Sequence, residues 1–246
     1  MGIGDWISSG ISAAVSFGRA VCNTVVSIGR AAVNFAGEYV PKIITSVINA
    51  GSVIGGIASV VCQALGIFRE REETEEMGDR FKQGAEAGIT LDKFEDFDEY
   101  MEAIRNFKLD PEKSKNTSST EKIMAGLAVT AVGMEHKLGL PNGLGGAVWL
   151  LAAANPEYFN ADRLNALLAA GNPARVLQFF EGKLGPAADL QARDAIVEVE
   201  RARQPAATVQ DIYKELVAAR QAVADMRPID LNAVPPANAS TGSPER

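Results

Sequence analysis

The sequence predicts an all-α protein with an N-terminal apolar and amphipathic helical hairpin, a soluble helical bundle and a disordered C-terminal tail. In the first part, polar residues recur at gaps of three and four, the spacing of one face of an α-helix. Almost no stretch alternates polar and apolar residues as a half-buried strand does. Proline and glycine divide the second half into segments of helical length. The predicted parts are the hairpin at 1–68, an acidic amphipathic helical connector at 69–112, the bundle at 113–226 and the tail at 227–246.

The first helix is predicted over Asp5–Glu38, where the polar positions form a continuous stripe. A five-residue pattern, SFGRA at 16–20, returns eleven residues later as SIGRA at 27–31, and eleven residues make three helical turns. Arg19 and Arg30 therefore share one face of the helix. In a water-filled lumen they would disfavour cations, and on a helix lying flat on a bilayer they would bind lipid phosphates.

The second helix is predicted after Pro41, a residue that suits a helix start or a bend between two helices. The stretch Ile43–Phe68 contains no charged residue. As a helix it would extend about 39 Å, which exceeds the roughly 30 Å hydrocarbon core of a bilayer. Gly51 and Gly55 form a G-x-x-x-G pair, extended by Ser59, which permits close helix contact in lipid. The two helices are therefore predicted to form a membrane-inserting hairpin.

Both helices carry stripes of polar residues, mostly uncharged, that could line water in an assembled pore. Hydroxyl and amide groups suit this role because they cost far less to desolvate than charges do. Two helices cannot enclose a wide channel, so the hypothesis requires several copies to assemble in the bilayer. An alternative stays open, in which both helices form the core of a soluble all-α protein. The predicted pore-lining residues are Ser12, Ser16, Arg19, Asn23, Ser27, Arg30, Asn34, Thr45, Asn49, Ser52, Ser59 and Gln63.

A charged segment begins at Arg69 and marks the predicted aqueous end of the hairpin. Residues 69–110 carry 14 acidic and 7 basic side chains. A solvated helix face is favoured over a cation site, because the segment has no EF-hand spacing. Apolar residues at helical spacing predict an amphipathic helix over Leu91–Ile104. The polar stretch Lys113–Thr120 is predicted to be a linker, and Ser118 with Glu121 has the spacing of a capping box.

The second half is predicted to be a helical bundle whose last helix spans Thr208–Met226. Leu138–Pro156 is another uncharged stretch, but its short apolar core favours a buried soluble helix over a membrane span. Arg227–Arg246 is rich in Pro, Ala, Asn and Ser and is predicted to be disordered.

The composition argues against enzymatic chemistry and against nucleic-acid binding. A net charge of −7 does not supply the basic surface that binds nucleic acid. Cys22 and Cys62 alone cannot form a disulfide framework or a thiolate metal site. The single histidine, His136, follows Glu135 near a helix end with no catalytic partner, and the glycine run at 143–146 lacks the surroundings of a phosphate loop. We therefore expect no catalytic residue, metal or cofactor.

The glycine- and serine-rich paired helices at residues 5–68, with Asp5 as the first charge instead of the basic start of a secretion signal, resemble the pore-forming effectors of bacterial type VI secretion. The hairpin is also similar to that of pore-forming colicins. The resemblance implies an antibacterial toxin that is soluble before insertion, secreted without a cleaved signal, and able to permeabilise or depolarise a target-cell membrane. It also implies delivery by a secretion machine and neutralisation by an immunity protein. The apolar surface of the two helices separately requires shielding in solution, by the rest of the chain, a carrier or chaperone, or self-association, and the inserted helices would contact a lipid bilayer and further copies of the chain.

Two other classes of protein remain open. A membrane-associated scaffold would bind a bilayer and recruit a partner without ion flux. A soluble all-α protein with an unusually apolar core would not bind a bilayer.

Overall fold

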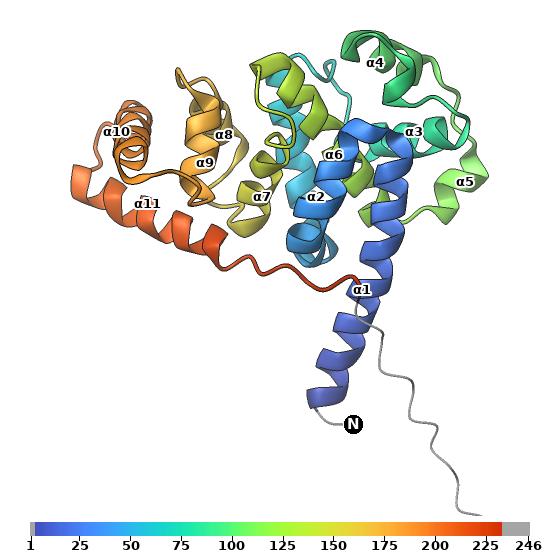
Figure 1. Ribbon diagram of the computed structural model, residues 1–246, viewed down its shortest axis with the longest axis horizontal. Coiled ribbons are helices and arrows are strands. Elements are labelled where there is room, and N and C mark those ends of the chain that lie inside the picture. Colours follow the sequence, from blue (N-terminus) through green and yellow to red (C-terminus); the bar gives the residue numbers. More distant parts are fainter. Residues whose placement is uncertain (1–2, 233–246) are drawn as a thin grey trace, which may run out of the picture.

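A computed structural model describes residues 3–232, with side chains from Val15 onward except that of Phe17. These residues form helices and connecting turns without a strand, so the predicted all-α class is confirmed. In Figure 1 the helices pack side by side while α1 extends away from them. Positions 233–246 of the predicted tail lie outside the described residues. The elements are α1 (Ile3–Ile28), η1 (Arg30–Ala32), η2 (Phe35–Tyr39), α2 (Val40–Ala64), α3 (Thr74–Glu86), η3 (Leu91–Lys93), α4 (Phe97–Asn106), α5 (Pro111–Asn116), α6 (Ser119–Leu138), α7 (Gly146–Ala154), α8 (Ala161–Leu168), α9 (Pro173–Phe180), α10 (Pro186–Arg203) and α11 (Val209–Ala224).

The first helix ends at Ile28, so the prediction of one continuous helix over Asp5–Glu38 is wrong. Gly29 has a φ of 151°, a value that residues with a side chain rarely adopt. The carboxylate of Asp92 accepts hydrogen bonds of 3.0 and 3.2 Å from the backbone N–H of Arg30. A distant segment of the chain therefore fixes the break, and the chain reaches α2 through η1 and the π-helical turn η2.

The second helix is the central helix of the molecule. Pro41 lies in its first turn, as predicted, and a kink occurs at Ala50, where φ is −137° and ψ is 30°. α2 contacts α6, α7, α8 and η2, and it shares one continuous hydrophobic core with helices from α1 to α11. The most deeply buried side chains of α2, each at most 1% exposed, are Val40, Ile43, Ile44, Val47, Ile54, Ala58, Val61 and Cys62.

α3 and α6 cross with their backbones in contact. A Cβ atom at Gly78 would overlap the carbonyl oxygen of Lys122, and one at Gly126 would overlap the carbonyl oxygen of Thr74. Each glycine therefore removes the side chain that would otherwise hold the two helices apart. This crossing holds α3, which belongs to the acidic segment, against α6, the helix with which the second half of the chain begins.

The acidic segment is more divided than the sequence predicts. The stretch Leu91–Ile104 is not one helix, because only α4, from Phe97, is α-helical and η3 is a separate 3-10 turn. The side chain of Asp96 caps α4 by accepting a 2.8 Å hydrogen bond from the backbone N–H of Glu99, which favours a helix start at this position. The predicted linker Lys113–Thr120 is also corrected, since α5 covers part of it and is capped by Asp110.

Local signals in the second half are confirmed. Ser118 and Glu121 form the predicted capping box of α6, and Thr208 and Asp211 form another at the start of α11. α7 is a buried helix of 9 residues, as favoured over a membrane span. Arg163 of α8 pairs with Glu200 of α10 through two contacts of 2.8 and 3.1 Å, with 8% and 1% of the two side chains exposed.

Candidate membrane-active surface

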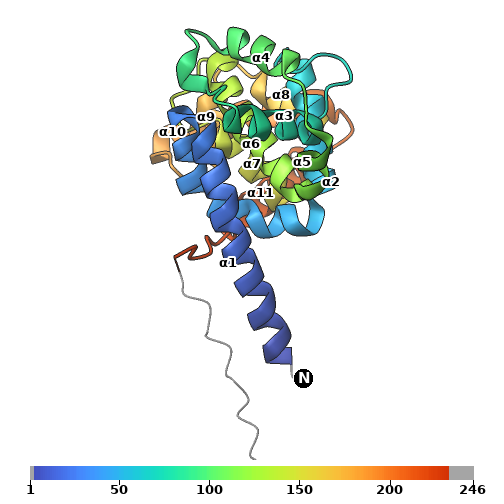
Figure 2. The same cartoon turned by 90° about the vertical axis from the view of Figure 1, so that its right-hand side faces the viewer.

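The first helix projects from the molecule. Figures 1 and 2 show its N-terminal half lying away from the other helices, while its C-terminal half packs against them. In the packed half, the inward face consists of Val15, Gly18, Val21, Val25 and Ile28 at helical spacing, all buried. α1 is therefore attached through one apolar face along only part of its length.

The predicted pore-lining residues of the first helix lie on its outer face. Ser16, Arg19, Asn23 and Ser27 are exposed and follow one another at gaps of three and four along α1. The side chain of Ser12 lies outside the described ones.

Beyond the break at Gly29, Arg30 and Asn34 are also exposed but no longer continue the α1 helix. They border a surface cavity of about 550 Å³ together with Asp92, Glu135 and His136. The stripe is therefore interrupted in this conformation.

The predicted stripe of α2 divides into two halves. Thr45, Asn49 and Ser52 are exposed. Ser59 is buried, where its hydroxyl oxygen accepts a 2.9 Å hydrogen bond from the backbone N–H of Thr74. Gln63 is half-buried and donates a 2.9 Å hydrogen bond from its side chain to the carbonyl oxygen of Glu72. The C-terminal half of the stripe therefore binds residues of the same chain.

The predicted helix-packing glycines serve a contact within the molecule. A Cβ atom at Gly51 would lie 3.2 Å from Cδ1 of Ile123, and one at Gly55 would lie 3.5 Å from its Cγ1. α6 therefore occupies the surface that would otherwise be open to another copy of α2. Sequence reasoning missed Ile123 as the partner, because the G-x-x-x-G pattern states that a helix approaches but not which one.

The outer face of α2 carries no charge. It contains three large apolar side chains, Ile48, Val53 and Val60, that are 44%, 52% and 47% exposed. No charged residue occurs between Lys42 and Arg69. This face can meet an apolar or interfacial environment without desolvating a charge. Its exposed members are Thr45, Ile48, Asn49, Ser52, Val53, Gly56, Val60 and Ala64, and we call it the uncharged face.

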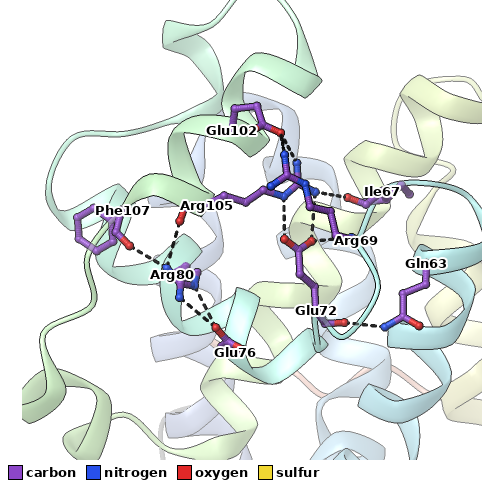
Figure 3. A network of polar contacts seen from close by, with 9 residues as sticks. All are labelled: Gln63, Ile67, Arg69, Glu72, Glu76, Arg80, Glu102, Arg105 and Phe107. Carbon is purple, nitrogen blue, oxygen red and sulfur yellow. Dashed lines mark hydrogen bonds and ion pairs between the residues drawn. The ribbon is translucent and has the colours of Figure 1, made fainter.

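A network of ion pairs holds the connection that follows α2 to α4 (Figure 3). Arg105 donates hydrogen bonds of 2.8 and 3.1 Å to the carboxylate of Glu72, and a third of 3.0 Å to the carbonyl oxygen of Ile67. Arg69 and Arg105 both contact Glu102, at 2.6 and 2.9 Å. Acidic side chains in this part of the segment therefore form ion pairs with arginines of the same segment. The prediction of a solvated helix face did not include these pairs.

Burial favours the neutral form of Glu72, but the hydrogen bonds from Arg105 and from the backbone of Arg69 outweigh it. They hold the pKa of Glu72 below its ordinary value. The carboxylate of Glu72 is therefore a charged group in the network at neutral pH.

The glycine-rich turn at 143–146 binds a carboxyl group of the protein itself. Oε1 of Glu135 accepts hydrogen bonds of 2.9 and 3.0 Å from the backbone N–H groups of Gly143 and Gly145. Burial raises the pKa of Glu135 and the two backbone donors oppose the rise. His136 is exposed, with its ring centre 6.1 Å from that of Phe97. Among the described residues, no three His, Cys, Asp or Glu side chains are grouped to hold a metal ion.

These features describe an all-α protein with a projecting helix and a central apolar helix. Within the described residues, Arg30–Ala64 is the one helical stretch long and apolar enough to cross a membrane, and 39% of its most apolar window is buried. The core helix of a soluble protein meets the same criteria. Comparison with known protein families, with curated proteins and with solved structures finds no match for this chain.

Proposed function

We propose that this protein is membrane-active and permeabilises a target membrane after its N-terminal helices enter the bilayer. The observation that carries the proposal is the uncharged face of α2, which exposes three large apolar side chains beside a projecting helix. In the sequence, the N-terminal half of α1 holds a single charge, at Asp5. Such a helix gains free energy by entering the bilayer interface, where its apolar side chains leave water.

The burial of α2 divides the proposed action into two steps. α1 is the element that can meet lipid first, because half of it lies away from the bundle. α2 can follow only after it leaves α6, α7 and α8. Inserted copies would then assemble with the polar residues of both stripes turned toward water, as a pore requires.

The proposed biological role is that of an antibacterial effector toxin that depolarises a target cell. Its proposed partners are the lipid bilayer, other copies of the chain in the inserted state, a carrier or chaperone before delivery, and an immunity protein in the producing cell. The support is the arrangement of apolar helices alone.

A membrane-associated scaffold is the second candidate. It is favoured by the burial of α2 and by the ion pairs that hold the connection after it, because both oppose release of this helix. In that case α1 alone would bind the bilayer, and the exposed surfaces of the bundle would recruit a partner.

Ion flux and vesicle binding, measured together on liposomes, separate these candidates. We compare the full chain with a variant that carries Thr45→Leu, Asn49→Leu and Ser52→Leu, three exposed positions whose replacement leaves the core intact. Flux by the full chain that this variant loses, while it still binds vesicles, is the expected result for a pore lined by α2.

The matched control carries Gln210→Leu, Ala218→Leu and Gln221→Leu on exposed positions of α11. It should keep the flux of the full chain. Binding without flux by the full chain would support the scaffold, and neither binding nor flux would place the protein in the soluble all-α class.

A further inference from the structure

The segment after α11 returns to the first helix. Figure 1 shows the chain running from the end of α11 across the molecule to α1. On this path, the backbone N–H of Ile229 donates a 3.0 Å hydrogen bond to the carbonyl oxygen of Pro41. The segment therefore contacts the start of α2 before it reaches α1. It occupies the beginning of the stretch predicted to be a disordered tail.

Two residues of α1, Gly18 and Arg19, contact this segment. Leu231 packs where Gly18 lacks a side chain, since a Cβ atom there would lie 2.5 Å from Cδ2 of Leu231. Nε of Arg19 donates a hydrogen bond to the carbonyl oxygen of Leu231. Figure 1 shows this segment meeting α1 where the helix leaves the bundle. The contact therefore lies where α1 would separate from the other helices.

The segment crosses the space between α1 and the start of α2 without filling it. A cavity of about 680 Å³ lies between the segment, α1 and η2, bordered by Cys22, Ala36 and Pro41 on one side and by residues 228–232 on the other. The described attachment consists of one backbone hydrogen bond, from Ile229 to Pro41, one hydrogen bond from the Arg19 side chain, and the partly buried side chains of Ile229 and Leu231. It can be released without opening the hydrophobic core around α2.

We propose that residues 228–232 form a strap that holds α1 against the bundle, and that release of the strap precedes binding of α1 to a lipid bilayer. The second clause rests on the proposed membrane function. The first does not, because it concerns only the attachment of α1 to the rest of the chain. The strap joins α1 to residues that follow it by more than 200 positions in the sequence, so attachment or release of residues 228–232 would control the N-terminal helix.

Limited trypsin digestion reports opening of this contact, because cleavage after Arg19 requires release of its side chain from Leu231 as well as local opening of α1. We follow the release of fragment 1–19 by mass spectrometry in the full chain and in a chain that ends at Met226. We expect cleavage about tenfold faster without the strap, the factor that loss of the contact made by the half-buried side chain of Leu231 predicts. A chain that ends at Asn232 keeps the strap and should match the full chain.

Point variants test the same contact from both sides. Leu231→Asp on the strap and Gly18→Leu on α1 should each accelerate cleavage after Arg19, since one removes the apolar contact and the other fills the space that Leu231 occupies. Val217→Asp adds the same charge at a position that is 69% exposed on α11 and should change nothing. Circular dichroism confirms that each variant keeps its helices.

Vesicles of phosphatidylethanolamine and phosphatidylglycerol complete the test. Faster cleavage together with stronger vesicle binding, in the chain that ends at Met226 and in Leu231→Asp, supports the proposal. Equal cleavage with and without the strap would overturn it. Faster cleavage with unchanged vesicle binding would show that the strap does not control membrane binding. If no chain binds vesicles, the proposed function is overturned, and the cleavage rates alone then decide whether the strap holds α1.

Discussion

At the scale of single residues, the crossing of α3 and α6 depends on two positions that tolerate no side chain. Gly78 and Gly126 each face a backbone carbonyl of the opposite helix. A carbonyl group cannot move aside as the end of a flexible side chain can, so a methyl group there must push the helices apart. Gly56 on α2 is free of this constraint, because no atom lies within 4 Å of the position of its missing Cβ.

Gly78→Ala is therefore expected to destabilise the protein by about 3 kcal/mol, because it overpacks the crossing. Gly56→Ala should instead stabilise it by about 0.5 to 1 kcal/mol, since alanine is the better helix former on an exposed face. Urea denaturation of both variants measures the two free energies of unfolding. Equal effects of the two substitutions would contradict the close crossing.

At the scale of elements, local sequence predicts helix starts better than helix ends. The capping boxes at Ser118 and Thr208 were predictable because each needs only residues within one turn. The end of α1 was not, because the patterns SFGRA and SIGRA are nearly identical while Gly18 lies within α1 and Gly29 ends it. The difference comes from Asp92 and Leu91, which meet the chain at Gly29 and lie far away in the sequence.

The contact between α4 and the connection from α2 to α3 also depends on such distant partners. Glu72 and Arg105 are 33 positions apart, and nothing in their local sequence pairs them. Their side chains are 18% and 13% exposed, so the pair is screened less than the many surface pairs of the same segment. This network fixes the connection after α2 in the position that Figure 3 shows.

The stability of the network should depend on pH with a defined sign. The folded pKa of Glu72 lies below its unfolded value, so its contribution is complete above the ordinary glutamate pKa of about 4.3 and is lost as the pH falls through the lower folded pKa. We expect Glu72→Gln to reduce the free energy of unfolding by about 1 kcal/mol at pH 7, with the difference from the unmodified chain shrinking below pH 4.

The control for this prediction is Glu112→Gln. Glu112 pairs with Lys115 on α5, where the side chains are 75% and 71% exposed, and the substitution should have no measurable effect. Denaturation curves between pH 3 and pH 7 provide the comparison. A difference for Glu72→Gln that grows on acidification would show that the carboxylate is destabilising in the folded state.

At the scale of the whole molecule, composition predicted the apolar second helix but not its surroundings. The run Ile43–Phe68 has the length and apolarity of a membrane span, and in the structure it is the centre of the core. A central core helix and a membrane helix have the same composition, because both exchange water for apolar contacts. The candidate membrane-active surface was predictable only where it depends on local spacing. The exposed polar positions of α1 follow from their spacing, whereas the burial of Ser59 depends on its contact with Thr74 of α3.

The central place of α2 gives a prediction for truncation. A chain that lacks residues 1–14 keeps every buried side chain described in the structure, so its thermal midpoint should remain within about 3 °C of that of the full chain. A chain that lacks residues 1–68 loses the helix around which α6, α7 and α8 pack and should not fold. Circular dichroism during heating measures both, and cooperative unfolding of the shorter chain would show that the second half is an independent domain.

The position of α2 also sets an order of events during synthesis. This helix is complete at Ala64, but the helices that cover it, α6, α7 and α8, end only at Leu168. The ribosome must therefore add about a hundred residues, which takes roughly 5 to 20 s, before the cover exists. During those seconds the producing cell meets the apolar helix uncovered, so any protein that shields the nascent chain must act before the fold is finished.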